Sequence, residues 1–249
     1  MPFVELEKHN KIAVARLNRG KVHALNEALV DELTDCFDQL ENDNATEAVI
    51  LTGTGKFFSF GLDIPDLFPY SQADFKIFLE KFTTLYKKMY LLGKPLVAAI
   101  NGHCIAGGFI LATTADNRVM VQEKAKIALN EISFGSTIFA GAMAMLRAQV
   151  GQQNGERIAL SGAMFTATEA LEMTLVDDLC DEANLMEKAQ ENASNMICGN
   201  PLAYGSIKQL LRRPIVADWE KYEPDSIDQF IEIWYSPSVR ENLKKIEIK

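Results

Sequence analysis

Apolar and polar residues alternate along the first part of the chain, as they do in a strand with one buried face. The alternation covers residues 3–7 and then residues 12–17. The polar stretch between them, 8–11, suits the turn of a hairpin. The sequence therefore predicts that the fold begins with two antiparallel strands.

Longer segments change to the period of a helix, with an apolar residue at every third or fourth position. One such segment continues to Glu41 and follows Asn26, whose side chain can cap a helix. A second predicted helix covers residues 72–92. The apolar runs 47–52 and 96–100 follow the first and second helix and predict buried strands.

The later part of the chain is mostly helical. Short helices are predicted over 141–150, over 154–160 and from a Thr166 or Thr168 cap to Met173, with a short strand over 176–179. From about Glu182 the helical pattern is broken into pieces by Pro201, Pro214, Pro224 and Pro237. No Gly/Ser-rich linker separates residues 1–181 from 182–249, so the two parts are expected to form one structural unit.

The charge of the chain limits the classes of partner. Asp and Glu number 34 against 25 Lys and Arg, which gives a formal net charge of −9. Nucleic acid and anionic membranes repel such a chain on average, so neither is an expected partner. No apolar run approaches the ~20 residues that cross a bilayer, and the charged N-terminus does not resemble a signal peptide. A cytoplasmic protein is predicted.

Several common catalytic signatures are missing from the sequence. The histidines have no carboxylate at ligand spacing and the cysteines form no CxxC pair, so no metal site is predicted. These cysteines are Cys36, Cys104, Cys180 and Cys198. The segment TGTGKF lacks the spacing of a P-loop, no GxGxxG follows a strand, and no serine lies in GxSxG. Carboxylate side chains and backbone amides remain as the candidate catalytic groups.

Two glycine-containing segments and one carboxylate are the candidates. The run 106–108 (AGG) precedes helical residues, so its amides would lie at a helix N-terminus, which favours negative charge. The loop 57–64 (FFSFGLDI) contains Gly61, which lets the backbone approach another group closely. Glu131 has apolar neighbours, and burial would raise its pKa. For the AGG run the alternative is close packing of a helix, for the loop 57–64 it is a structural turn, and for Glu131 it is an exposed position on a strand.

Taken together, these segments resemble the crotonase superfamily, the enoyl-CoA hydratase/isomerase family, over essentially the whole chain. The resemblance is carried by KVHALN at 21–26, FFSFGLDI at 57–64, KPLVAAINGHCIAGGFILATTADNRV at 94–119 and LNEISFG at 129–135. It implies an α/β fold, with a spiral of ββα turns over 1–181 and C-terminal helices for trimerisation over 182–249. It also implies an acyl-CoA thioester as ligand, a homotrimer or dimer of trimers, and no separate cofactor, because coenzyme A is part of the substrate.

The resemblance also assigns roles to individual residues. The two backbone amides that hold the thioester oxygen map to Phe60 and Gly107. The residues expected to bind CoA are Lys21, Val22, Ala24, Leu62, Asp63 and Ile64, joined by Lys244 or Lys245. The acyl pocket is expected from Ile110, Phe134, Ile138 and Phe139.

One departure from the family pattern separates the possible reactions. Hydratases of the family use two glutamates, which align here with Ile110 and Glu131, so one is missing. Adding water calls for an acid and a base, whereas moving a double bond needs one base that carries a proton from C2 to C4. The resemblance therefore favours the Δ3,Δ2-enoyl-CoA isomerase subgroup, with Glu131 as the sole acid and base. A hydratase-like or divergent crotonase enzyme and a non-catalytic acyl-CoA-binding protein are the alternatives.

Overall fold

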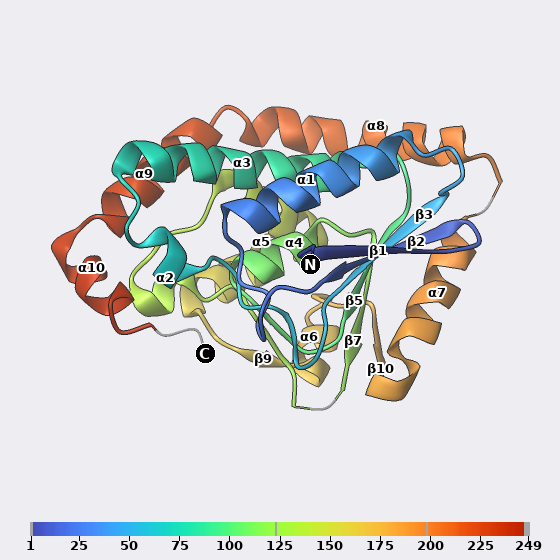
Figure 1. The fold of residues 1–249 in the computed structure, drawn as a ribbon, viewed down its shortest axis with the longest axis horizontal. Coiled ribbons are helices and arrows are strands. Elements are labelled where there is room, and N and C mark those ends of the chain that lie inside the picture. The colour runs from blue at the N-terminus through green and yellow to red at the C-terminus, as the bar shows by residue number, and fades with distance from the viewer. Residues whose placement is uncertain (1, 123, 198, 247–249) are drawn as a thin grey trace.

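Figure 1 shows the computed structural model, which describes residues 2–122, 124–197 and 199–246. Cys198 and residues 247–249 of the predicted C-terminal region lie outside the described residues. The larger sheet has the order β1 (Val4–His9), β2 (Ile12–Leu17), β3 (Ala48–Thr52), β5 (Leu96–Ile100), β7 (Asn117–Val121) and β10 (Asp178–Cys180). The smaller sheet has the order β4 (Phe57–Ser59), β6 (His103–Ile105), β8 (Lys126–Ala128) and β9 (Phe165–Thr166).

Helices follow the strands in a repeated order. They are α1 (Glu27–Asn42), α2 (Ile64–Leu67), α3 (Gln72–Leu91), α4 (Gly107–Thr113), α5 (Ala140–Ser161), α6 (Ala167–Glu172), α7 (Leu185–Met196), α8 (Pro201–Trp219), α9 (Glu223–Trp234) and α10 (Pro237–Leu243). Short 3-10 helices occur at η1 (Glu131–Phe134) and η2 (Glu182–Asn184).

The chain alternates between the two sheets. β3 is followed by β4, β5 by β6 and β7 by β8, and helices come after each of these pairs. Neighbouring strands from β2 to β10 are parallel, which requires a crossover connection between them. The repeated ββα unit confirms the predicted fold class. β1 and β2 form the predicted antiparallel hairpin, whose turn contains Asn10 at a φ of 55°.

Helices cover the larger sheet and then one another. Figure 1 shows α1, α3 and α8 running side by side on one side of the molecule and α7 on the other. α7 packs against β3, β5 and β7, whereas α3 packs against α1, α8 and α9. α1 forms where the apolar period predicts it, because its buried residues share one face and the Asn26 side chain accepts a hydrogen bond from the Leu29 amide. No helix within the described residues is long and apolar enough to cross a membrane.

Some predicted boundaries differ from those in the structure. The two helices predicted over 141–160 are joined as α5, with a break at Gly151, whose φ is 78°. The short strand predicted over 176–179 lies at 178–180. The prediction that Pro214 ends a helix is wrong, because this residue lies inside α8. Pro214 has no amide hydrogen to donate to the Leu210 carbonyl one turn earlier, and both residues are exposed in the single chain.

A buried charged cluster fixes the end of α4. The Asp116 carboxylate lies 2.6 Å from Lys208 Nζ and 2.8 Å from Arg212 Nη2. Arg212 also donates a hydrogen bond to the Thr114 carbonyl at 3.0 Å. Burial lowers the pKa of Lys208 to about 8, although Asp116 opposes this shift. The cluster thus ties α8 to the helix that begins at Gly107.

Candidate active site

Two backbone turns meet at the start of α4. Ala106 has a φ of 50° and Gly107 begins the helix, while Gly61, in the loop after β4, has a φ of 90°. A Cβ placed on Gly61 would lie 2.8 Å from the Gly107 nitrogen and 2.9 Å from the Ala106 Cβ. Only a glycine fits at position 61, because a side chain would both strain the backbone and collide with the neighbouring turn.

The amides of Leu62 and Gly107 are neighbours and are free to bind a ligand. A Cβ placed on Gly107 would lie 3.5 Å from the Leu62 nitrogen. The described part of the chain offers neither amide a hydrogen-bond acceptor. Two adjacent free N–H groups, one of them at a helix start, can stabilise a negatively charged oxygen.

The prediction that Phe60 supplies one of these amides is wrong. The Phe60 amide donates a hydrogen bond to the Val22 carbonyl at 2.9 Å. The Asp63 amide likewise donates a hydrogen bond to the Leu25 carbonyl at 2.9 Å. The left-handed backbone at Gly61 interrupts this pairing and leaves the Leu62 amide beside α4. The Phe60 side chain instead lines the cavity described next.

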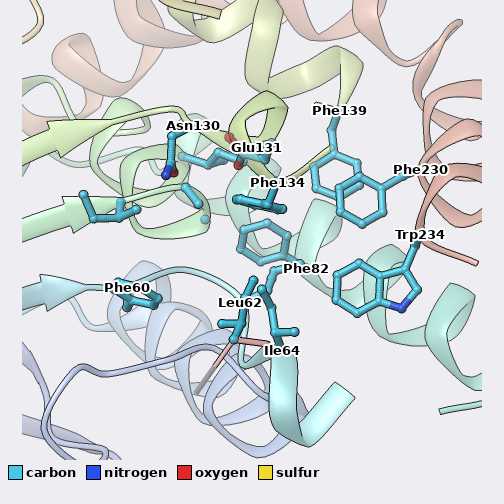
Figure 2. A pocket seen from close by; sticks show the side chains of 15 residues that line it. Phe60, Leu62, Ile64, Phe82, Asn130, Glu131, Phe134, Phe139, Phe230 and Trp234 are labelled. Carbon is cyan, nitrogen blue, oxygen red and sulfur yellow. The ribbon is translucent and has the colours of Figure 1, made fainter. Parts of the chain in front are cut away.

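A cavity of about 150 Å³ opens beside the two free amides (Figure 2). Its walls are mostly apolar. The residues that line it are Phe60, Leu62, Ile64, Phe82, Ile105, Ala106, Gly107, Ile110, Asn130, Glu131, Phe134, Phe139, Phe230, Trp234 and Ile246. Of the residues predicted for the acyl pocket, Ile110, Phe134 and Phe139 are among them, and Ile138 is not.

Glu131 is the ionisable group of this cavity. It is the first residue of η1 and only 5% exposed, and the Gly135 and Ser136 amides hydrogen-bond to the carbonyls of this short helix. Its carboxylate oxygen Oε2 has no hydrogen-bond partner among the described residues. Burial raises the pKa of Glu131 to about 8, and a hydrogen bond from its own backbone amide opposes this only in part. Such a carboxyl can both take up and release a proton near neutral pH.

Four residues that the sequence did not assign to the site line the cavity from distant elements. Phe82 comes from α3, Phe230 and Trp234 come from α9, and Ile246 follows α10. Phe82 belongs to the apolar face predicted for α3, and Phe230 and Trp234 lie one turn apart on α9. The apolar period thus indicates burial of these side chains. It carries no information about which buried side chains face a cavity.

The predicted CoA-binding residues lie on two adjacent segments. Leu25 and Leu62 form a parallel bridge, which brings segment 21–24 beside segment 62–64. Lys21 is exposed, whereas Ala24 is buried. Lys244 and Lys245 are exposed at the end of α10.

Asp63 differs from the other predicted CoA-binding residues because its carboxylate is already paired. It lies 2.6 Å from Arg19 Nη1 and is only 7% exposed. The same Arg19 nitrogen donates to the Ala24 carbonyl at 2.7 Å. This pairing makes Asp63 a support for the turn.

His23 is buried at the centre of the same turn, with a φ of 48°. Its Nδ1 accepts a hydrogen bond from the Arg19 amide at 3.1 Å, and its Nε2 lies 2.9 Å from the Thr54 carbonyl. Burial lowers the pKa of His23, which favours the neutral ring. His23 therefore stabilises the turn through its contacts with Arg19 and Thr54. Among the described residues, no group of three or more His, Cys, Asp or Glu side chains could hold a metal ion.

Comparison with known proteins identifies the family of the chain. The model of the enoyl-CoA hydratase/isomerase family matches residues 7–245. The chain belongs to this family. The short-chain-enoyl-CoA hydratase of Clostridium acetobutylicum is 31% identical over 217 residues, which cover 86% of this chain and 83% of the relative. Enoyl-CoA delta isomerase 1, mitochondrial, of Mus musculus is 28% identical over 243 residues, which cover 97% and 84%.

The solved structure of human mitochondrial delta3-delta2-enoyl-CoA isomerase is also similar to this member of the family. Its TM-score is 0.93 at 26% identity, and the match covers 97% of this chain and 95% of that one. Hydratases and isomerases thus resemble the chain at comparable identities. The choice between the two reactions depends on the residues of the site.

The burial of Glu131 couples the stability of the protein to pH. The unfolded chain releases this proton near pH 4.5, whereas the folded protein keeps it up to about pH 8, so the wild type loses stability as pH rises between these values. Glu131→Gln removes the titration. We expect this variant to exceed the wild type in free energy of unfolding at pH 8 by on the order of 4 kcal/mol, with the gain disappearing towards pH 4.5. Urea unfolding measured across this pH range tests the expectation, with the exposed Glu172→Gln as the control. A gain that does not vary with pH would contradict it.

Proposed function

We propose that this member of the family is an isomerase that moves the double bond of a 3-enoyl-CoA to the 2-trans position, as in the β-oxidation of unsaturated fatty acids. The observation that carries the proposal is the set of groups around the cavity. Glu131 is the only ionisable side chain among the described residues that line it. Ile110, where the sequence pattern of the hydratases has a second glutamate, contributes an apolar wall from α4.

The reaction that we propose uses this single carboxylate twice. Ionised Glu131 takes a proton from C2 of the substrate, and the electron pair left behind spreads over C2, C4 and the thioester oxygen. The Leu62 and Gly107 amides stabilise the charge on that oxygen. Protonated Glu131 then returns the proton at C4, and the double bond forms between C2 and C3. The raised pKa suits both steps, because the group must release the proton as readily as it accepts it.

A hydratase is the second candidate, favoured by the relative from Clostridium acetobutylicum at 31% identity. Addition of water requires groups that hold the water molecule against the double bond as well as a proton donor. Asn130, beside Glu131, also lines the cavity, and its Oδ1 is buried without a partner among the described residues. An amide can bind water, but it cannot replace a carboxylate as a base at neutral pH. A non-catalytic acyl-CoA-binding protein would have no use for a buried carboxylate without a cationic partner among the described residues, because such a group is costly to maintain.

The remaining roles follow from the same proposal. We assign the CoA nucleotide to Lys21 and to the backbone of Val22 and Ala24, and the acyl group to the apolar part of the cavity. Assembly as a homotrimer or dimer of trimers is supported by several exposed apolar side chains on α8, because a cluster of such side chains is typical of a protein–protein interface. These side chains are Leu202, Ile207, Leu210 and Leu211. A cytoplasmic location stays a prediction from the sequence.

Replacement of Glu131 tests the proposed reaction. We expect Glu131→Gln to lower the isomerisation rate of 3-hexenoyl-CoA by at least about 10³-fold, while binding of saturated hexanoyl-CoA is retained. For the wild type, kcat/KM should rise with pH up to about 8, because only the ionised carboxylate accepts the proton. Wild-type turnover by the variant would refute the role of Glu131. Rapid formation of 3-hydroxybutyryl-CoA from crotonyl-CoA by the wild type would favour a hydratase instead.

The contact between the two turns gives a separate test. Gly61→Ala places a methyl group 2.8 Å from the Gly107 nitrogen, so we expect the pair of amides to separate. The isomerisation rate should fall by about 10²–10³-fold, as it does when one oxyanion donor is lost. Gly55→Ala is the matched control, because Gly55 also has a positive φ of 63° but no atom near its Cβ position. Equal activity of the two folded variants would contradict the assignment of Leu62 and Gly107.

A further inference from the structure

The end of the cavity away from Phe60 is closed by aromatic rings. Figure 2 shows Phe139, Phe230 and Trp234 gathered on one side, with Glu131 between them and Phe60. The rings of Phe139 and Phe230 are stacked with centroids 4.7 Å apart. Phe75 supports Trp234 from α3, with centroids 4.6 Å apart. Interlocked rings of this kind form a stiff apolar surface.

Hydrogen bonds hold the N-terminal end of α9 against α5. The Glu223 carboxylate accepts a hydrogen bond from the Gly141 amide at 2.8 Å. The Ser226 hydroxyl accepts one from the Ala140 amide at 3.1 Å. Both bonds join the start of α9 to the start of α5, directly after Phe139. α9, which carries Phe230 and Trp234, is thereby fixed to the start of α5 next to Phe139.

The C-terminal end of α9 is fixed to another part of the chain. The Tyr235 hydroxyl donates to the Tyr70 carbonyl at 2.6 Å. Arg240, on α10, donates to the Phe68 carbonyl at 2.9 Å, and its guanidinium lies 3.4 Å from the centre of the Phe68 ring. The aromatic wall is therefore anchored at both ends of α9. A ligand would have to break these contacts to push the wall outward.

The volume between the two free amides and the aromatic wall limits the size of the acyl group that can bind. The cavity is about 150 Å³ in total, and this includes the space beside Gly107 and Glu131 where the thioester and C2 must lie. An apolar cavity of about 150 Å³ in another protein holds one benzene ring. An acyl group of about six carbons therefore fills the space between the amides and the wall.

We propose that the site selects short acyl groups, of about six carbons or fewer, and that Trp234 sets this limit. The proposal rests on the proposed function in one respect, that the ligand is an acyl-CoA. Trp234 is 1% exposed and lines the cavity at its aromatic end. Its indole Nε1 has no hydrogen-bond partner among the described residues, so a smaller side chain changes the volume without breaking a hydrogen bond.

Binding of saturated thioesters tests the limit without requiring any reaction. We expect the wild type to bind hexanoyl-CoA at least about tenfold more tightly than dodecanoyl-CoA, because the excess methylenes have no space. Trp234→Phe and Trp234→Leu should reduce this preference, with the larger reduction for leucine, because each opens the end of the cavity. Trp219→Phe is the matched control. Trp219 is also buried, at 3% exposure, but lies outside the lining of this cavity.

The outcomes separate this proposal from the proposed function. Equal affinity of the wild type for the two thioesters would overturn the size limit. An unchanged preference in both Trp234 variants, with melting temperatures close to that of Trp219→Phe, would overturn the role of Trp234. Selective binding of hexanoyl-CoA without isomerisation of 3-hexenoyl-CoA would support the size limit and refute the isomerase alone. If neither thioester binds, both proposals fail.

Discussion

The contact between Gly61 and Gly107 is the constraint on which the rest of the site depends. The two residues come from different ββα turns of the spiral, and their backbones approach so closely that no side chain fits between them. This approach places the Leu62 and Gly107 amides together, and the described residues offer neither amide an acceptor. The surrounding structure supports the contact, since Arg212 holds the far end of α4 and His23 braces the turn beside Gly61.

The second constraint is the burial of a carboxyl that has no cationic partner among the described residues. Among the described lining residues, no cation offsets the desolvation of Glu131, so its pKa rises to about 8. A buried carboxyl of this kind reduces the stability of the fold at neutral pH. It also supplies a proton acceptor and donor of balanced strength. Glu131 thus lowers the stability of the fold at the position where the proposed chemistry needs an ionisable group. Such a trade is common at functional sites.

The sequence reveals local structure and recurring motifs better than it reveals the final geometry of the site. The helix after Asn26 is predictable because its cap and its apolar period are both local. The glycine motifs and Glu131 identify the family and the fold for the same reason. The free amide is Leu62 instead of Phe60, since the backbone conformation at Gly61 decides which N–H group stays unpaired. Phe139 of the aromatic wall was predicted through the resemblance, but Phe230 and Trp234 were not, because they reach the cavity only through the packing of α9 against distant helices.

In the proposed reaction, one carboxylate carries a proton from C2 to C4. Conversion of 3-hexenoyl-CoA labelled with deuterium at C2, performed in ordinary water, tests it most directly. NMR of the product from the earliest turnovers should show deuterium at C4, because Glu131 is shielded from solvent while it holds the label. A product that carries only solvent hydrogen at C4, or a hydroxyl group at C3, would contradict the account.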